Sequence, residues 1–225
     1  MIITFRQNWN ECDHPVKPVR PEIERIITMT ITYTVGDSLY VNTTNRCSNS
    51  CDFCVRSHGE ELYGDLWLER EPTREEILAD IESHSPEKYP ELVFCGYGEP
   101  TERLDDILWV CRELKKKYRL KIRINTNGHS DLINNRDTAP EYEGLVDTVS
   151  ISLNCADAKS YQAVCHSEFG EKSYDALIDF AKRVKNYVPN VVFSVVRGSI
   201  PDSDIDVCRQ TAESIGVKLR VREML

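Results

Sequence analysis

The chain has 225 residues, of which 40% are hydrophobic and 29% are charged, and its formal net charge is -9 at pH 7. This length suits one sizeable domain, and no apolar run approaches the roughly 20 residues that a membrane-spanning helix needs. The acidic balance disfavours nonspecific binding to nucleic acid, which relies on a basic surface.

The first residues lack the basic stretch, apolar run and small-residue cleavage site of an export signal. We therefore expect a cytoplasmic protein. The chain has nine cysteines, an odd number. In such a protein they indicate reduced thiols and a metal or cluster site rather than a disulfide framework.

Residues 1–28 are predicted to be an N-terminal extension of undefined structure, because three prolines interrupt any long element: Pro15, Pro18 and Pro21. Cys12 and His14 lie in this extension. They are either a weak metal-binding pair or solvated tail residues.

From residue 29 to 225 the pattern predicts one domain, in which short β-branched runs alternate with longer amphipathic stretches. A hairpin is expected at 29–40, beside the first barrel strand. Strands are expected at 39–43, 91–95, 121–125, 148–153, 191–196 and 217–221. Helices are expected at 73–82, 104–118, 174–187 and 204–215, the first with Thr73 and Glu76 in a capping box. These six units predict an α/β fold, a partial (β/α)6 barrel of parallel strands.

Three cysteines follow the first barrel strand at C-x3-C-x2-C spacing: Cys47, Cys51 and Cys54. Such a loop lies at the carboxyl edge of the sheet, where sites assemble in these folds. Three thiolates hold three irons of a cubane and leave the fourth iron open, whereas a cubane ligated by cysteine alone needs four. The alternative is a zinc site with His58 as fourth ligand. Five other cysteines are interpreted as buried small hydrophobes: Cys95, Cys111, Cys155, Cys165 and Cys208.

This motif, with Phe53 as the aromatic residue before the last cysteine, resembles that of the radical S-adenosylmethionine (SAM) superfamily. The resemblance implies that the three cysteines hold a 4Fe-4S cluster whose fourth iron binds the amino and carboxylate groups of SAM. One electron then cleaves SAM into methionine and a 5'-deoxyadenosyl radical. The chain is therefore expected to be an enzyme that abstracts hydrogen from a substrate, with a reductant such as flavodoxin or ferredoxin.

The same resemblance implies SAM contacts at later strand ends. Residues 96–99 are similar to the family's Gly-Gly-Glu motif, which implies that Gly98 and Glu99 lie against the SAM amino group. By the same resemblance, Asn125 is implied to contact the methionine part of SAM. Ser152 and Asn154 are implied to contact the ribose and the carboxylate. Val195, with its neighbours Ser194 and Val196, is implied to contact the adenine.

Each of these motifs also has a plainer interpretation. Gly98-Glu99-Pro100 and Asn127-Gly128 are ordinary turn sequences. The alternating polar residues of the strand at 148–153 are equally typical of a hydrogen-bond network in the core. Their order along the chain, one strand end after another, favours the SAM site.

Five segments further resemble a subgroup of the superfamily associated with TatD-type nucleases: 39–42, 44–47, 66–72, 95–101 and 150–154. The resemblance implies a nuclease partner but no substrate, so no catalytic residue is assigned. A bare barrel of this length is also similar to the activating enzymes of glycyl radical proteins and to 7-carboxy-7-deazaguanine synthases. An iron-sulfur electron carrier is the alternative from another class, and it would have no SAM pocket.

Overall fold

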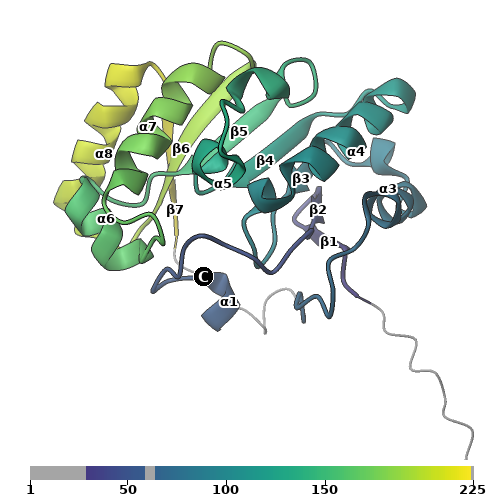
Figure 1. Ribbon diagram of the computed structural model, residues 1–225, viewed down its shortest axis with the longest axis horizontal. Helices are drawn as coiled ribbons and strands as arrows, with labels where there is room; N and C mark the ends of the chain where they lie inside the picture. Colours follow the sequence, from purple (N-terminus) through teal and green to yellow (C-terminus); the bar gives the residue numbers. More distant parts are fainter. Residues whose placement is uncertain (1–28, 59–63, 224–225) are drawn as a thin grey trace, which may run out of the picture.

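The computed structural model describes residues 29–58 and 64–223, which build one seven-stranded sheet (Figure 1). The strands lie side by side in chain order: β1 (Thr32–Val35), β2 (Ser38–Val41), β3 (Leu92–Phe94), β4 (Ile122–Thr126), β5 (Thr148–Ser152), β6 (Asn190–Val196) and β7 (Lys218–Arg222). β1 pairs antiparallel with β2, and all later neighbours are parallel. The six parallel strands confirm the predicted partial barrel, which stays open between the edge strands β1 and β7.

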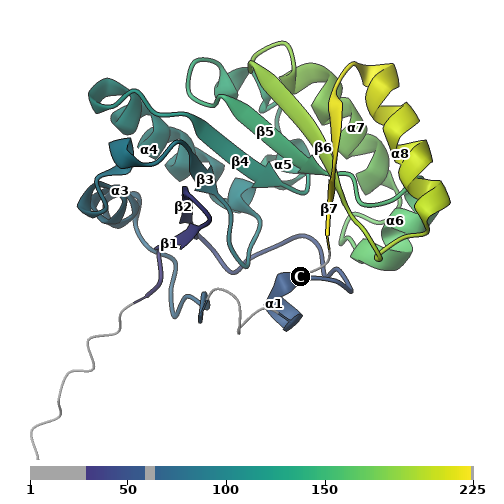
Figure 2. The ribbon, with the colours of Figure 1, turned by 180° about the vertical axis from the view of Figure 1, so that it is seen from behind.

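Helices cover one face of the sheet (Figure 1), and Figure 2 shows the other face without them. The longer helices are α3 (Arg74–Ser83), α4 (Leu104–Lys117), α7 (Lys172–Val184) and α8 (Asp202–Ile215). Shorter ones are α1 (Val55–His58), α5 (Ser130–Asn134), α6 (Ala158–Cys165) and the 3-10 turns η1 (Pro86–Lys88), η2 (Pro100–Arg103) and η3 (Ala139–Tyr142). No helix within 29–58 and 64–223 is both long and apolar enough to cross a membrane.

Two helix ends are set by particular residues. The Thr73 hydroxyl accepts a hydrogen bond from the Glu76 amide at 3.2 Å, and the Glu76 carboxylate accepts one from the Thr73 amide at 2.8 Å. This is the predicted capping box. α8 ends at Gly216, whose φ of 77° lies in the left-handed region that glycine adopts without steric cost.

Alternation along the strands decides which side chains face the helices. In β4, Ile122 and Ile124 are fully buried in the core, whereas Arg123 and Asn125 are partly exposed on the open face. Burying each large apolar side chain stabilises the fold by about 1.5–3 kcal/mol. A slip of one residue would turn that set toward the open face, so the core fixes the register and with it the lining of the open face.

Some elements differ from the expectation. The predicted hairpin is confirmed, but its second strand, β2, is itself the first barrel strand instead of lying beside it. α5 and α6 were not expected because each is too short to show a clear helical period. The Asp157 carboxylate, which accepts hydrogen bonds from the Lys159 and Ser160 amides at the start of α6, was the available signal. The predicted extension, with Cys12 and His14, lies outside the described residues.

Candidate functional site

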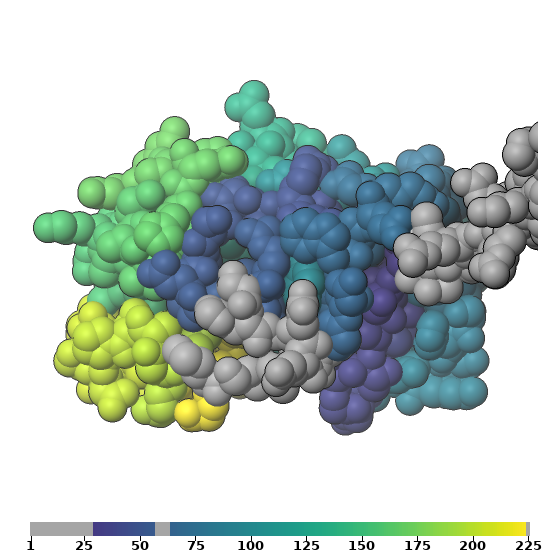
Figure 3. Space-filling view, turned by 90° about the horizontal axis from the view of Figure 1, so that it is seen from below, coloured from purple at the N-terminus to yellow at the C-terminus, as the bar shows by residue number. Residues whose placement is uncertain are grey.

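The three motif cysteines lie on the segment that follows β2, residues 42–54, at the carboxyl edge of the parallel strands. Figure 3 views this edge from below, and the segment, in blue, crosses between the purple hairpin and the yellow C-terminal elements. Cys47, Cys51 and Cys54 are all partly exposed free thiols. The structure therefore brings the motif to the surface at the edge where the sequence predicted a site.

One side of this cysteine loop is held by α6. The Ser50 amide donates a hydrogen bond to the Cys165 carbonyl at 3.0 Å, and the Asp52 amide donates one to the Val164 carbonyl at 3.0 Å. Both carbonyls belong to the last turn of α6, whose carbonyls have no partner within the helix. Since α6 follows β5, the position of the fifth strand also sets that of the cysteines.

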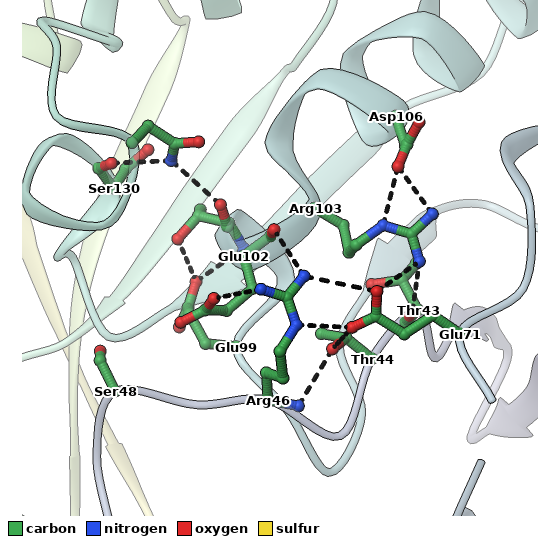
Figure 4. A network of polar contacts seen from close by, with 12 residues as sticks. Thr43, Thr44, Arg46, Ser48, Glu71, Glu99, Glu102, Arg103, Asp106 and Ser130 are labelled. Atoms are coloured by element: carbon green, nitrogen blue, oxygen red, sulfur yellow. Dashed lines mark hydrogen bonds and ion pairs between the residues drawn. The ribbon is translucent and has the colours of Figure 1, made fainter. Parts of the chain in front are cut away.

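The other side is held by ion pairs, drawn in Figure 4. The Arg46 guanidinium lies 2.7 Å from the Glu71 carboxylate and 3.0 Å from that of Glu102. Arg103 contacts the same Glu71 carboxylate at 3.3 Å. The Arg46 side chain is 55% exposed, so each of its pairs contributes at most about 1 kcal/mol. Together they orient the loop against η2 and the start of α4.

Gly98 lets the turn after β3 touch the cysteine loop. A Cβ at this position would lie 2.3 Å from the Thr44 carbonyl oxygen and 2.5 Å from that of Arg46. The next amide, of Glu99, donates a hydrogen bond to the Arg46 carbonyl at 2.8 Å. A side chain at residue 98 would therefore separate the two segments, so the second glycine of the Gly-Tyr-Gly-Glu motif is required by packing.

The Glu99 side chain is 4% exposed and accepts four hydrogen bonds. The donors are the Thr101 amide at 3.0 Å, the Thr101 hydroxyl at 2.7 Å, the Thr126 hydroxyl at 2.7 Å and the Asn127 amide at 2.6 Å. Burial raises the pKa of this carboxyl, against the effect of its donors. Glu99 thus ties the turn after β3 to the end of β4, and its contact with SAM stays a prediction.

The cysteine thiols differ in acidity. Burial, followed by repulsion from Glu99, raises the pKa of Cys47 to about 12, and burial also raises the pKa of Cys54. The hydrogen bond with Cys165 lowers the pKa of Cys51. Metal binding must release the protons of Cys47 and Cys54, because thiolates are the ligands. In the described ranges no three His, Cys, Asp or Glu side chains gather closely enough to hold one metal ion, but in a cubane each thiolate binds its own iron.

Polar side chains at the next strand ends include acceptors without partners. Asn125 Oδ1 in β4 and Asn154 Oδ1 after β5 are buried and accept no hydrogen bond from the described residues. Leaving such a group unsatisfied costs about 1–3 kcal/mol, so a buried acceptor without a donor indicates a missing partner. Ser152 lies beside Ser194 in the register of β5 and β6, so the two side chains are on the same face of the sheet. The amino group and ribose hydroxyls of SAM are donors, so these residues fit that cofactor.

Two other predicted contacts lie less directly at the site. Phe53 is partly buried and packs against the core between Cys51 and Cys54. Val195 is fully buried in the core on the helix-covered face. Of the three residues considered on β6, Ser194 and Val196 therefore lie on the open face, where an adenine contact is expected.

A buried network behind the cysteine loop was not anticipated. The Asn127 side chain donates to the Ser48 hydroxyl at 2.9 Å, and the Asn49 side chain donates to the Tyr161 hydroxyl at 2.9 Å. His129 lies between them, 3.4 Å from both hydroxyls. Burial lowers the pKa of His129 to about 4, so the ring is neutral and supports the loop by packing. These partners are too far apart in sequence for any local pattern to reveal them.

The structure combines a partial barrel, three cysteines after its first parallel strand and buried acceptors without partners at neighbouring strand ends. This combination is typical of an enzyme that binds a metal cluster beside a small organic cofactor. The chain belongs to the radical SAM superfamily, whose family model matches residues 41–211. It is therefore a radical SAM enzyme, and its cofactors are a 4Fe-4S cluster and SAM.

Individual relatives are similar over part of their length. A tungsten-containing aldehyde ferredoxin oxidoreductase cofactor-modifying protein of Pyrococcus furiosus is 37% identical over 99 residues, which are 40% of this chain and 23% of that protein. Streptococcus suis SuiB bound to the precursor peptide SuiA matches with a TM-score of 0.63 at 17% identity, over 84% of this chain and 39% of SuiB. A radical SAM methyltransferase from Sphaerobacter thermophilus matches with a TM-score of 0.60 at 16% identity, over 85% and 68%. The structural matches show the fold alone.

Proposed function

We propose that Cys47, Cys51 and Cys54 hold the 4Fe-4S cluster, and that the chain cleaves SAM reductively to a 5'-deoxyadenosyl radical that abstracts hydrogen from a substrate. The observation that carries the proposal is a ligand set of three thiols, which leaves one iron open, beside buried acceptors without partners on Asn125 and Asn154. A flavodoxin or ferredoxin is the expected reductant.

The test is anaerobic reconstitution with iron and sulfide, followed by dithionite and SAM, with 5'-deoxyadenosine measured by chromatography. Cys51→Ala is expected to abolish the product, because the cluster loses one of its three ligands. Cys208→Ala is the matched control: it removes a fully buried thiol from α8, which does not carry the cysteine loop. Product formation by Cys51→Ala at the rate of Cys208→Ala would refute the cluster assignment.

An electron carrier of the same fold would give a different result. It would form a stable cluster, but it would yield no 5'-deoxyadenosine with dithionite or with a biological reductant. The unpaired acceptors on Asn125 and Asn154 favour the SAM enzyme, because a carrier has no ligand to satisfy them.

The substrate class is a separate question. Similarity to the Pyrococcus furiosus cofactor-modifying protein supports modification of a cofactor or its precursor. A peptide, the class that SuiB binds, is a second substrate class to test. Membership of the TatD-associated subgroup, with a nuclease partner and a cytoplasmic location, rests on the resemblance in sequence. Activation of a glycyl radical protein and a reaction like that of 7-carboxy-7-deazaguanine synthase are the alternatives. Product analysis after incubation with each substrate class distinguishes them.

A further inference from the structure

Three arginines converge on the open face of the sheet. Arg123 lies in β4, and Arg220 and Arg222 lie in β7. Arg220 pairs in register with Ser194, and Arg222 pairs with Val196. Because side chains alternate along a strand, the two β7 arginines share the face on which Ser194 lies. We refer to the three residues as the basic cluster.

Two members of the basic cluster, Arg123 and Arg220, line a cavity on the open face, the face that Figure 2 views. The cavity has a volume of about 250 Å³ and is lined by Glu91, Arg123, Thr148, Ser150, Val192 and Arg220. Ser150 is two residues before Ser152, the residue expected at the SAM ribose, and points to the same face. Two strand residues span about 7 Å, so a molecule in the cavity reaches toward the cofactor.

Positive charge in this cavity is only partly balanced. Arg123 Nε lies 2.9 Å from a Glu91 carboxylate oxygen, and Arg123 also donates to the Tyr40 hydroxyl at 3.4 Å. Arg220 and Arg222 form no ion pair with any residue in the described ranges. Burial and the charges of Arg220 and Arg123 lower the pKa of Arg222, so both neighbouring guanidinium groups act on Arg222. The cavity lining thus has one carboxylate, Glu91, against two cations, Arg123 and Arg220, in a chain whose net charge is -9.

We propose that the basic cluster binds the carboxylate or phosphate group of a small anionic substrate and directs the rest of that molecule toward SAM. A guanidinium group pairs both kinds of anion in a bidentate manner, and such charge-assisted hydrogen bonds are the strong ones. The volume suits a small organic acid or a phosphate monoester, being below the range usual for larger ligands. The inference rests on the proposed function only in calling the bound molecule the substrate.

The test is calorimetric titration of the reconstituted protein with inorganic phosphate and, separately, with succinate. We expect saturable binding of at least one anion to the unaltered protein. Arg220→Gln with Arg222→Gln should weaken that binding at least tenfold. Arg112→Gln with Arg209→Gln is the matched control, since it removes the same charge from exposed positions on α4 and α8. Glu91→Gln should tighten binding, because it frees Arg123.

The preferred probe identifies the group, phosphate or carboxylate. The proposal is overturned if neither anion binds, if the control pair weakens binding as much as the β7 pair, or if Glu91→Gln weakens it. Formation of 5'-deoxyadenosine by the unaltered protein is measured in parallel. Cleavage of SAM without anion binding would overturn the basic cluster alone, and anion binding without cleavage would overturn the proposed function alone.

Discussion

Replacing Gly98 with alanine should detach the cysteine loop from the turn after β3. The added methyl group would lie 2.3 Å from the Thr44 carbonyl oxygen and 2.5 Å from that of Arg46, and a Cβ contact under 3.0 Å forces a shift. Both oxygens belong to the backbone, so no side-chain rotation relieves the clash. The Thr44 oxygen would have to move by about 0.7 Å, the difference between 2.3 Å and 3.0 Å.

The cost follows from these contacts. Overpacking of this kind destabilises by about 1–3 kcal/mol. Moving the loop also stretches the 2.8 Å hydrogen bond between the Glu99 amide and the Arg46 carbonyl, which is worth about 1 kcal/mol. The free energy of unfolding should therefore fall by about 2–4 kcal/mol, and Tm by about 4–16 °C for a domain of this size.

The assay combines thermal unfolding, followed by circular dichroism, with iron and sulfide content after reconstitution. Gly144→Ala is the control, because nothing lies within 4 Å of its Cβ position and only its φ of 70° is strained. It should lower Tm modestly, at a cost of about 1 kcal/mol, and leave the iron content unchanged. A Gly98→Ala protein with both the Tm and the iron content of the unaltered protein would refute the close contact.

Three further changes are predicted. Glu99→Gln should lower the free energy of unfolding by about 1–3 kcal/mol in denaturant titrations, because an amide nitrogen must face donors such as the Asn127 amide. The pKa of His129 is near 4 in the folded state, against 6.5 for an exposed histidine, so the unfolded chain binds the proton more tightly. The free energy of unfolding should therefore fall by about 3 kcal/mol as pH falls from 6.5 to 4. In His129→Phe, the midpoint of urea unfolding should lose the part of its fall between pH 6.5 and 4 that His129 causes. Thr73→Ala should cost about 1 kcal/mol by thermal unfolding, because the cap of α3 loses its acceptor for the Glu76 amide.

Each of these changes has a control or a contrary outcome. Equal denaturation midpoints for Glu99→Gln and the unaltered protein would mean that the four hydrogen bonds add nothing to stability. An unchanged slope between pH 4 and 6.5 in His129→Phe would assign the acid sensitivity to other groups. Thr73→Asp keeps a capping oxygen and should retain what Thr73→Ala loses.

The sequence by itself determined the features that depend on local order. The spacing of Cys47, Cys51 and Cys54, the alternation of strands and helices, and the capping box at Thr73 each involve residues within a few positions of one another. Their physics is local as well: ligands on one loop, one turn of helix, or the period of a strand. The partial barrel could therefore be predicted from these patterns, and the cofactors from the resemblance of the cysteine motif to that of the radical SAM superfamily.

Only the tertiary structure decided how the strand ends meet. The donors to Glu99 include Thr126 and Asn127, which are nearly thirty positions further along the chain. Val195 lies between polar Ser194 and apolar Val196, and pairing with β5 decides which face it takes. The basic residues of β7 look like an exposed edge in the sequence, and they gather around Arg123 only because an open sheet curves β4 and β7 toward one face. Contacts of this kind depend on register and curvature, which the packing of the whole core sets and no short segment encodes.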